Sequence, residues 1–461
     1  MTAPGPLIVL DDDPTGTQAM ADVPVLLRWD DGQLDRALER GERVVHLITN
    51  SRALPPDDAR RLVEDAARIA LRAAPDADIV LRGDSTLRGH LLEEYLAVRA
   101  ARAGDSPAGR PWPVLLLVPA LPAAGRVTVD GMHLLERDGR RTPLHDTEYA
   151  RDAAFGYRGA RLLAWAEERS DGFFPAGAGV EIRLDDLRLR GPQAVAEALC
   201  ALDHDSADAP AVCAADAETI DDLRVIAAGY GAARAEGADV MVRCAPTFAG
   251  VLSGLLAPHT VPMPAPDGPI LVVCGSYVPT STRQLSALMA AEAGSLVEAD
   301  VVALASDPAE EEIRRLAERI TTLLDADGFG VLATPRQRPS GTHDLAAQGR
   351  IATNFAAVVG RVRNRLGMLI VKGGVTSAVT ASVGLGADEA RVVGPVIDGV
   401  GCWRIELSDD SSLPYLVVPG NVGEDDLLVR LVTMARAAPT LWRDTRGRGP
   451  VAGRPGESVS D

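Results

Sequence analysis

The 461-residue sequence has little of what marks a secreted, membrane-bound or metal-rich protein. Its cysteines are odd in number and form no CxxC pair, which argues against a disulfide framework and predicts a reducing, cytoplasmic location. Seven scattered histidines provide no zinc-ligand spacing. There is no run of about 18 apolar residues, so no membrane span is expected. The N-terminus also lacks the basic segment that begins a signal peptide. The cysteines are Cys200, Cys213, Cys244, Cys274 and Cys402.

Positive charge is scarce as well. Lys and Arg total 47 against 65 Asp and Glu, so the formal net charge is −18. Because nucleic acid needs a basic protein face and anionic lipid attracts basic segments, neither partner is expected. Lys372 is the only lysine among the 47 basic residues. A GC-rich genome explains most of this bias, but a single retained lysine also suggests a site that needs a compact point charge.

The chain does have a regular alternation of short apolar runs and amphipathic stretches. In the first half we expect helices such as 56–74 and 91–103 between strands at residues 7–12, 43–50, 78–82 and 114–118. In the second half we expect strands at 270–274, 296–299, 329–333, 368–372, 391–397 and 413–418. The helices expected there are 280–293, 308–324, 343–366, 376–385 and 423–437. This alternation predicts an α/β fold built from mostly parallel sheets.

The proline-rich segment 257–269 predicts a domain boundary, because proline stiffens linkers and stops helices. We therefore expect an N-terminal domain at 1–256, a linker at 257–269 and a C-terminal domain at 270–443. The Gly/Pro/Arg-rich tail 444–461 is expected to be disordered. Each domain should be a mostly parallel sheet flanked by helices. A homodimer is the commonest oligomer for such a protein.

Three consecutive aspartates, Asp11 to Asp13, follow the first expected strand and precede Pro14, Thr15 and Gly16. The simplest interpretation is a solvated turn. After a buried strand, however, the carboxylates point into the crevice at the carboxyl end of a parallel sheet. There they can bind Mg²⁺ or take a proton from a hydroxyl. Asp12 and Asp13 are the candidates for both roles, and the sequence does not say which residue has which role.

A short match also suggests a phosphatase. Asp11-x-Asp13-x-Thr15 resembles the first signature of the haloacid dehalogenase-type phosphatases, in which the first Asp is the nucleophile. Thr49-Asn50 resembles the second signature of that family. The later acidic pair that the family needs has no clean candidate between residues 80 and 250, and this hypothesis therefore stays an alternative.

Six motifs in order support a different hypothesis. Together they resemble the four-carbon acid sugar kinase family over roughly residues 7–437. The resemblance implies ATP-dependent phosphorylation of acids such as erythronate, threonate and their oxo derivatives, in carbohydrate-acid catabolism. It also implies that the first domain binds the acid, that the second binds the nucleotide, and that the active site lies in the cleft between them. The motifs are Asp12-Asp13-Pro14-Thr15-Gly16, Thr49-Asn50-Ser51-Arg52, Asp84-Ser85-Thr86-Leu87-Arg88-Gly89, Pro119-Ala120-x-Pro122 with Gly125-Arg126, Gly373-Gly374-x-Thr376-Ser377 and Gly420-Asn421-x-Gly423.

A small polyhydroxy acid needs a cation for its carboxylate, and arginine offers a planar, bidentate fork. Arg88 and Arg126, inside glycine-flanked motifs, are the favoured ligands, whereas Arg82 is expected to form a surface salt bridge. One of His133, His145, Glu148 and Asp152, in a segment that resembles the family, is a further candidate for a substrate contact. The full set of predicted substrate-binding residues is Thr15, Arg52, Asp84, Ser85, Arg88 and Arg126.

Glycine-containing turns after two strands of the second domain predict the nucleotide site, because backbone N–H groups at such turns can cradle phosphates. Lys372 would be a charge partner for phosphate. The predicted nucleotide contacts are Ser276, Lys372, Gly373, Gly374, Val375, Thr376, Gly420 and Asn421. Departures from the family pattern at Val278, Val375 and Gly401 leave a non-catalytic ligand-binding relative as another alternative. Trp403 is expected to be a core or surface filler.

Overall fold

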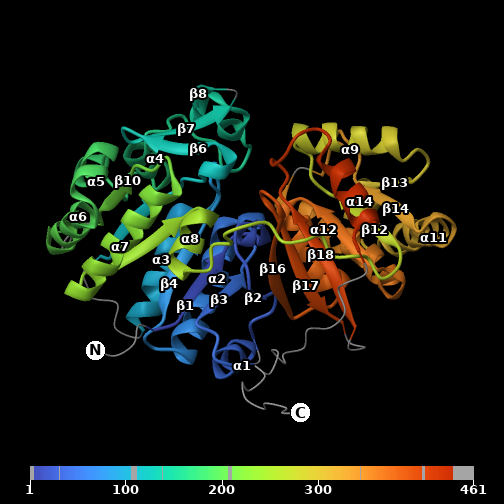
Figure 1. Cartoon of the computed structure of the whole chain (residues 1–461), viewed down its shortest axis with the longest axis horizontal. Coiled ribbons are helices and arrows are strands. Elements are labelled where there is room, and N and C mark those ends of the chain that lie inside the picture. The colour runs from blue at the N-terminus through green and yellow to red at the C-terminus, as the bar shows by residue number, and fades with distance from the viewer. Residues whose placement is uncertain are drawn as a thin grey trace, which may run out of the picture.

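The computed structural model describes residues 5–30, 32–104, 112–137, 139–205, 210–342, 344–407 and 411–439. The predicted tail 444–461 and the last residues of the predicted C-terminal domain, 440–443, lie outside these ranges. The chain forms the expected α/β fold, with the two halves side by side (Figure 1). None of the described helices is long and apolar enough to cross a bilayer.

Eight parallel strands among the described residues form the sheet of the first half. Their order is β2 (Val23–Leu26), β3 (Val44–Ile48), β1 (Leu7–Asp11), β4 (Asp78–Arg82), β11 (Val240–Cys244), β5 (Val114–Val118), β10 (Val212–Ala215) and β9 (Val180–Ile182). β1 is a continuous apolar run because helices cover both faces of a parallel sheet. The helices are α1 (Gln33–Glu39), α2 (Pro56–Ala73), α3 (Leu91–Ala103), α4 (Leu162–Arg169), α5 (Leu184–Arg190), α6 (Pro192–Asp205), α7 (Ile220–Glu236) and α8 (Pro246–Ser253).

A small antiparallel sheet lies at the top of this half in Figure 1. It consists of β6 (Arg126–Val129), β7 (Met132–Arg137) and β8 (Arg140–Pro143). The sequence pattern did not predict these strands. The first of them, β6, begins at Arg126 of the Gly125-Arg126 motif.

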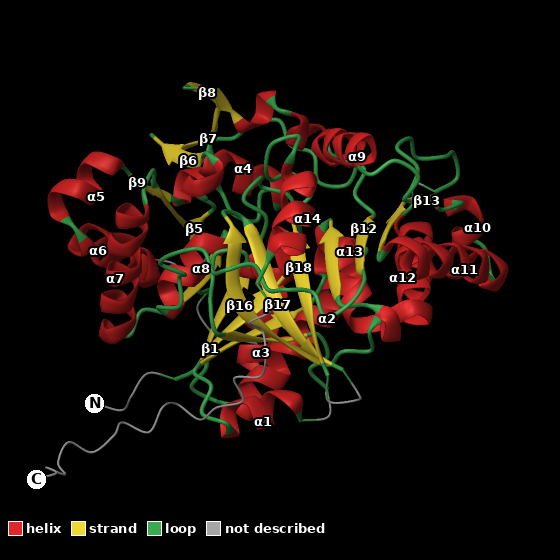
Figure 2. Cartoon of the chain, turned by 45° about the vertical axis from the view of Figure 1, so that its right-hand side comes forward, coloured by secondary structure: helices red, strands yellow, loops and turns green. Residues whose placement is uncertain are grey.

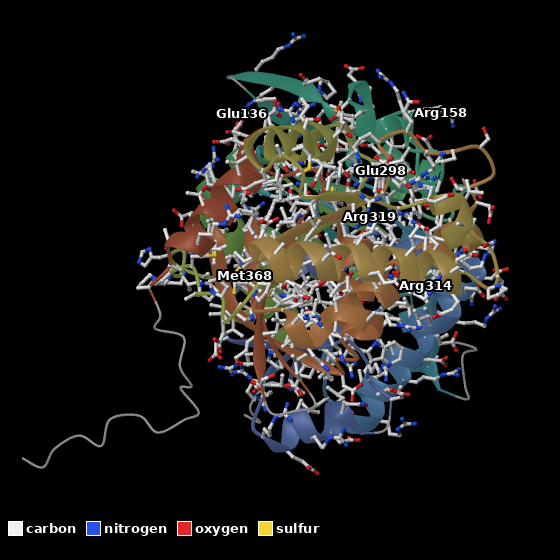
Figure 3. The ribbon with its side chains drawn as sticks, turned by 90° about the vertical axis from the view of Figure 1, so that its right-hand side faces the viewer. Glu136, Arg158, Glu298, Arg314, Arg319 and Met368 are labelled. Atoms are coloured by element: carbon white, nitrogen blue, oxygen red, sulfur yellow. The ribbon has the colours of Figure 1, made fainter. Side chains whose placement is uncertain are left out.

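Within the described part of the second half, the sheet has five parallel strands and two that pair only antiparallel. The parallel strands are β13 (Leu296–Glu298), β14 (Phe329–Ala333), β12 (Ile270–Cys274), β15 (Met368–Lys372) and β18 (Ser412–Val418). The antiparallel ones are β17 (Val400–Glu406) and β16 (Glu389–Ile397). Figure 2 shows helices on both sides of the sheet. They are α9 (Pro279–Ala291), α10 (Val301–Ala305), α11 (Glu310–Asp327), α12 (Leu345–Val362), α13 (Gly374–Val379) and α14 (Leu427–Ala437). Figure 3 faces the outer side of this half, where α11 carries the labelled Arg314 and Arg319.

The two halves share one sheet, which the sequence did not predict. β16 pairs antiparallel with β2, from Glu389 opposite Leu26 to Val392 opposite Val23, and this pairing yields a sheet of 15 strands among the described residues. β2 escaped prediction because its four residues include Pro24, and proline weakens a strand pattern. The segment 257–269 contains no helix or strand. The domain limits drawn around it remain a prediction.

Candidate active site

A cavity of about 690 Å³ lies where loops of the two halves meet. Most of the predicted site residues line it. From the first half these are Asp13, Thr15, Arg52, Asp84 and Arg88; from the second they are Ser276, Gly373, Gly374, Val375, Thr376, Gly420 and Asn421. Of the remaining predicted residues, Asp12, Ser85, Arg126 and Lys372 are not part of the cavity lining. Loops that are far apart in the sequence therefore form one site.

The acid loop, which we define as residues 11–17, begins where β1 ends. Asp13 caps the short 3₁₀ turn Pro14–Thr17 (η1), because its Oδ1 accepts a hydrogen bond from the backbone N–H of Thr15 at 2.8 Å. Proline at the first position of a helical turn is favourable, since its missing N–H would have no partner there. The same cap directs the Asp13 carboxylate toward the cavity that it lines.

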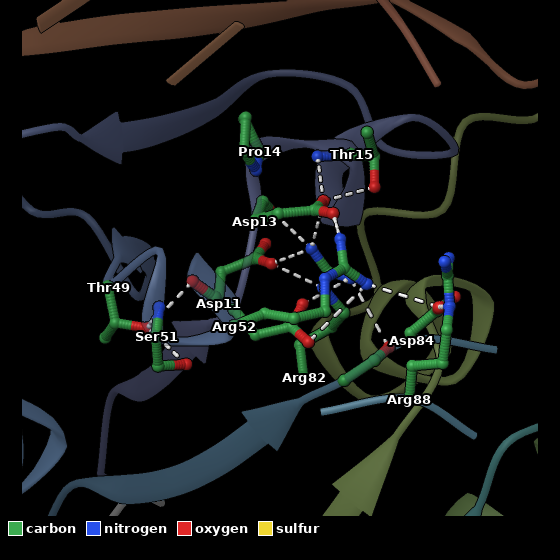
Figure 4. Close-up of polar contacts among 12 residues, drawn as sticks. Asp11, Asp13, Pro14, Thr15, Thr49, Ser51, Arg52, Arg82, Asp84 and Arg88 are labelled. Atoms are coloured by element: carbon green, nitrogen blue, oxygen red, sulfur yellow. Dashed lines mark hydrogen bonds and ion pairs between the residues drawn. The ribbon is translucent and has the colours of Figure 1, made fainter. Parts of the chain in front are cut away.

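Arg82 neutralises the acid loop from below (Figure 4). Its guanidinium forms an ion pair with Asp11 and lies 3.0 Å from a carboxylate oxygen of Asp12 and 3.0 Å from one of Asp13. The expectation of a surface salt bridge is wrong, because Arg82 is only 1% exposed. The reason is the sheet order: β4 lies beside β1, and Arg82 is the register partner of Asp11.

Asp11 belongs to this buried charge network and not to the cavity lining. It is fully buried, pairs with Arg82, and lies 3.0 Å from Nδ1 of His46. A phosphate ester in the cavity would not reach a carboxylate in this place. The structure therefore disfavours Asp11 as the nucleophile of a phosphatase.

Asp12 is the least hydrogen-bonded of the three acids. It is 1% exposed, and neither of its carboxylate oxygens has a hydrogen-bond donor with good geometry among the described residues. Burial raises the pKa of Asp12, although the nearby guanidinium groups of Arg52 and Arg82 lower it in part. The charge of Asp12 is thus balanced by arginines and not by hydrogen bonds.

Arg52 and Arg88 extend the charge network into the cavity. Arg52 forms ion pairs with Asp13 and, at 3.3 Å, with Asp84. Arg88 donates to Asp84 at 2.7 Å and lies 3.5 Å from Asp152, which also lines the cavity. Burial alone would raise the pKa of Asp84, but Arg88 and Arg52 hold it below its ordinary value. Asp84 therefore stays ionised and orients both arginines.

Arg126 is a buried cation without an acidic partner among the described residues. It is 2% exposed, and one terminal nitrogen lies 3.4 Å from the hydroxyl of Tyr149. Its Nε has no hydrogen-bond partner in the part of the chain that the structure describes. Arg88 and Arg126 both lie over the Tyr149 ring, 5.6 and 5.7 Å from its centroid. Ser85 is buried, and its carbonyl hydrogen-bonds to Nε2 of His133 at 2.8 Å.

The glycine loop, which we define as residues 372–377, begins at the last residue of β15 and includes the first residues of α13. Gly373 has a φ of 116°, a backbone conformation that glycine adopts without strain. A Cβ atom on Gly374 would lie 2.6 Å from Oδ2 of Asp13, so the glycine loop and the acid loop are in direct contact. A Cβ atom on Gly420 would similarly lie 2.7 Å from Oγ of Ser276. Glycine at both positions permits these four loops to converge on the cavity.

Lys372 does not line the cavity, although the sequence predicts it to be a phosphate partner. It is fully buried, and its Nζ donates to the carbonyls of Pro419 at 2.6 Å and Val422 at 3.4 Å. Burial lowers its pKa to about 7. In this structure the lysine supports the turn that carries Gly420 and Asn421.

Sequence reasoning missed several residues of the cavity. Arg338 lines it, lies 4.4 Å from the centroid of the Tyr277 ring, and has no acidic partner among the described residues. Ile351 and Phe355 on α12 supply an apolar wall. No motif surrounds Arg338, which is one arginine among many. Within the described ranges, no group of three or more His, Cys, Asp or Glu side chains could hold a metal ion.

Two models of known protein domains match this chain, one in each half. Residues 7–252 match the model of a sugar-binding N-terminal domain, and residues 271–428 match the model of a nucleotide-binding C-terminal domain. The cavity is thus lined from both matched regions.

Curated relatives match along most of this chain. A D-threonate kinase of Salmonella typhimurium is 26% identical, over 92% of this chain and 96% of its own length. A D-erythronate kinase of Heliobacterium modesticaldum is 30% identical, over 84% of this chain and 87% of its own length.

Two solved structures share the fold at low sequence identity. A Haemophilus influenzae protein superposes with a TM-score of 0.59 at 16% identity, covering 93% of this chain and all of the other. A Salmonella typhimurium protein superposes with a TM-score of 0.65 at 18% identity, covering 92% and 98% of the two chains. At this identity the likeness concerns the fold alone.

Proposed function

This chain belongs to the four-carbon acid sugar kinase family, and from that premise we propose that it transfers the γ-phosphoryl group of ATP to a hydroxyl of a sugar acid of about four carbons. The observation that carries the proposal is the contact between the acid loop and the glycine loop. Asp13, from the region that matches a sugar-binding domain, lies against Gly374, from the region that matches a nucleotide-binding domain. A hydroxyl beside Asp13 would therefore face a phosphate held at the glycine loop.

We assign Asp13 as the group that accepts the hydroxyl proton, because geometry comes before pKa in choosing a base. Asp13 lines the cavity, whereas Asp12 does not. The hydroxyl oxygen attacks the γ-phosphorus, the bond from that phosphorus to the β-phosphate oxygen breaks, and ADP leaves with those electrons. The proton goes to the Asp13 carboxylate. Arg52, which pairs with Asp13, would stabilise the developing charge.

Arg88 and Arg126 are our candidates for binding the carboxylate of the acid. Arg126 does not line the cavity, but it is buried without an acidic partner among the described residues, so a substrate carboxylate that reached it would supply the missing charge. Arg88 is held by Asp84 and presents its guanidinium at the cavity. Thr15, Asp84 and Ser85 stay proposed hydroxyl contacts.

Ser276, Val375, Thr376, Gly420 and Asn421 stay the proposed nucleotide contacts. Mg²⁺ would come bound to the nucleotide phosphates, because such sites typically use only one or two carboxylates beside phosphate and water. Asp12 and Asp13 are already close to Arg52 and Arg82, which would compete with a second cation. The predicted cytoplasmic location, catabolic role and homodimer remain predictions.

The test is ADP release with Mg-ATP and a panel of acids that includes D-threonate, D-erythronate, their enantiomers and oxo derivatives. We expect turnover with at least one four-carbon acid. The Asp13→Asn variant should lower kcat about 100-fold or more, the usual range for loss of a general base. Asp58→Asn, an exposed acid on α2, is the matched control and should leave kcat unchanged. Hydrolysis of p-nitrophenyl phosphate without ATP, with no acid phosphorylated, would overturn the proposal.

A further inference from the structure

Two aromatic side chains outside the cavity lining contact both the acid loop and the glycine loop. Trp403 on β17 and Tyr415 on β18 are opposite each other in an antiparallel strand pair, and both are fully buried. Their rings stack with centroids 5.9 Å apart and an interplanar angle of 21°. The expected role of Trp403 as a core filler is therefore correct but incomplete.

Each ring also donates one hydrogen bond, and the two bonds end on different loops. Nε1 of Trp403 donates to Oγ1 of Thr17, the last residue of η1 in the acid loop, at 2.9 Å. The hydroxyl of Tyr415 donates to the carbonyl of Ser377 at the end of the glycine loop, at 2.7 Å. The Ser377 hydroxyl in turn donates to the carbonyl of Gly373 at 2.8 Å. The stacked pair thus connects the two loops across the junction of the halves.

Simple core packing does not need these two donors, since a buried aromatic ring without a donor, such as that of phenylalanine, also packs in a core. A buried donor is unfavourable unless it finds an acceptor, and here both acceptors belong to loops that line the cavity. Phosphoryl transfer depends on the attacking hydroxyl and the phosphate being held in line, and displacements of about 1 Å can reduce rates about 100-fold. The aromatic pair therefore connects the two loops whose relative displacement would affect the rate of phosphoryl transfer.

We propose that the Trp403–Tyr415 pair is a positioning device that holds the acid loop in register with the glycine loop, an inference that rests on the proposed function. Neither residue lines the cavity, so neither is a catalytic residue. The pair acts through Thr17 at one end and through Ser377 at the other.

The test uses Tyr415→Phe, which keeps the ring and removes only the hydroxyl donor, and Trp403→Phe, which removes the indole donor together with part of the ring volume. The matched control is Tyr95→Phe, because Tyr95 is equally buried and donates to the carbonyl of Pro113 at the same 2.7 Å, away from the cavity. We expect kcat to fall about tenfold in both test variants with KM for ATP and acid within about twofold of wild type, and kcat of the control to stay unchanged. The proposal would be overturned if Tyr415→Phe lost as much thermal stability as Tyr95→Phe but kept the kcat of the wild type.

Hydrogen exchange provides a second readout that needs no turnover. We expect each substitution to speed amide exchange in the loop that is bonded to the other ring. Tyr415→Phe should therefore speed exchange in the acid loop, and Trp403→Phe should speed it in the glycine loop. Faster exchange confined to the loop nearest the substitution would contradict the proposal. If the wild-type protein phosphorylates no acid on the panel, the proposed function fails, and the exchange result alone then decides whether the pair couples the two loops.

Discussion

Individual cations have different tasks in the two halves of the cavity. In the first half, Arg52 and Arg88 are held by aspartates, which fix their orientation before substrate arrives. In the second half, Arg338 lines the cavity with no acidic partner among the described residues. Lys372, in contrast, is buried under the Pro419 turn. An incoming triphosphate would therefore meet Arg338 and not the lysine.

Arg338→Gln should weaken nucleotide binding selectively. A charge-assisted hydrogen bond to phosphate contributes about 1.5–3 kcal/mol, so we expect KM for ATP to rise about tenfold or more. KM for the sugar acid should change less than about twofold, and steady-state kinetics with each substrate varied separately would measure both. Arg283→Gln, which breaks an exposed ion pair with Asp425 outside the cavity, is the control. An equal rise in KM for both substrates would contradict the assignment of Arg338 to the nucleotide.

Lys372 should make stability depend on pH. Burial lowers its pKa from 10.5 to about 7, so between those values the unfolded chain binds the proton that the folded chain has lost. The free energy of unfolding contributed by this group therefore rises with pH through that window and is constant below about pH 7. Urea titrations of wild type and Lys372→Met across about pH 6–10 would measure it. We expect the wild-type curve to gain stability relative to the variant as pH rises, and parallel curves would contradict the shifted pKa.

At the scale of elements, the site is made of turns at the carboxyl ends of parallel strands. β1 ends at Asp11 and β15 ends at Lys372, and each strand is followed at once by a short helical turn. Side chains at these turns point to the same edge of the sheet, which is where ligands bind in open α/β folds. The contact of Gly374 with Asp13 is the point at which the two turns meet.

Gly374→Ala should separate the two turns. Its φ is not in the left-handed region, so alanine is allowed by the backbone, but the new Cβ would lie 2.6 Å from the Asp13 carboxylate. We expect kcat to fall about tenfold or more through misalignment, measured by ADP release. Gly231→Ala in α7, whose Cβ would meet no atom within 4 Å, should keep kcat and add up to about 1 kcal/mol of stability. Unchanged kcat in Gly374→Ala would show that the loop contact is not needed.

At the scale of the whole molecule, the two halves share a β-sheet and a buried apolar cluster as well as the cavity. The pairing of β2 with β16 makes one continuous sheet. One buried apolar cluster includes Val23 and Val25 from the first half together with Val273, Val392 and Trp403 from the second. Ion pairs of Arg391 with Asp22 and of Arg40 with Glu389 cross the same junction. Neither half therefore has an entirely separate core.

This continuity predicts a single cooperative unfolding transition. Urea unfolding followed by tryptophan fluorescence and by far-ultraviolet circular dichroism should give coincident curves, because a shared core couples the halves. Arg391→Ala, which removes an interaction across the junction, should shift both curves together to lower urea. Two separated transitions in the wild-type protein would show that the halves unfold independently.

The sequence by itself determined the parallel α/β scaffold and much of the candidate site. Strands such as β1, β4, β12 and β15 are predictable because burial on both faces demands continuous apolar runs. The turns that follow them carry aspartate, glycine and arginine in ordered motifs, and most of those residues line the cavity. Local pattern was sufficient because each such element is specified by its own neighbours in the chain.

Only the tertiary structure decided how these pieces meet. The burial of Arg82 follows from β4 lying beside β1, and the position of Lys372 follows from the Pro419 turn folding over it. The contact of Trp403 with Thr17 joins residues 386 positions apart, and Arg338 reaches the cavity from a loop without a motif. The sheet is continuous because β2 pairs with β16, and the sequence did not predict β2 because Pro24 interrupts its strand pattern. In each case the deciding interaction is made between segments distant in sequence, and no local pattern encodes a partner that only folding brings near.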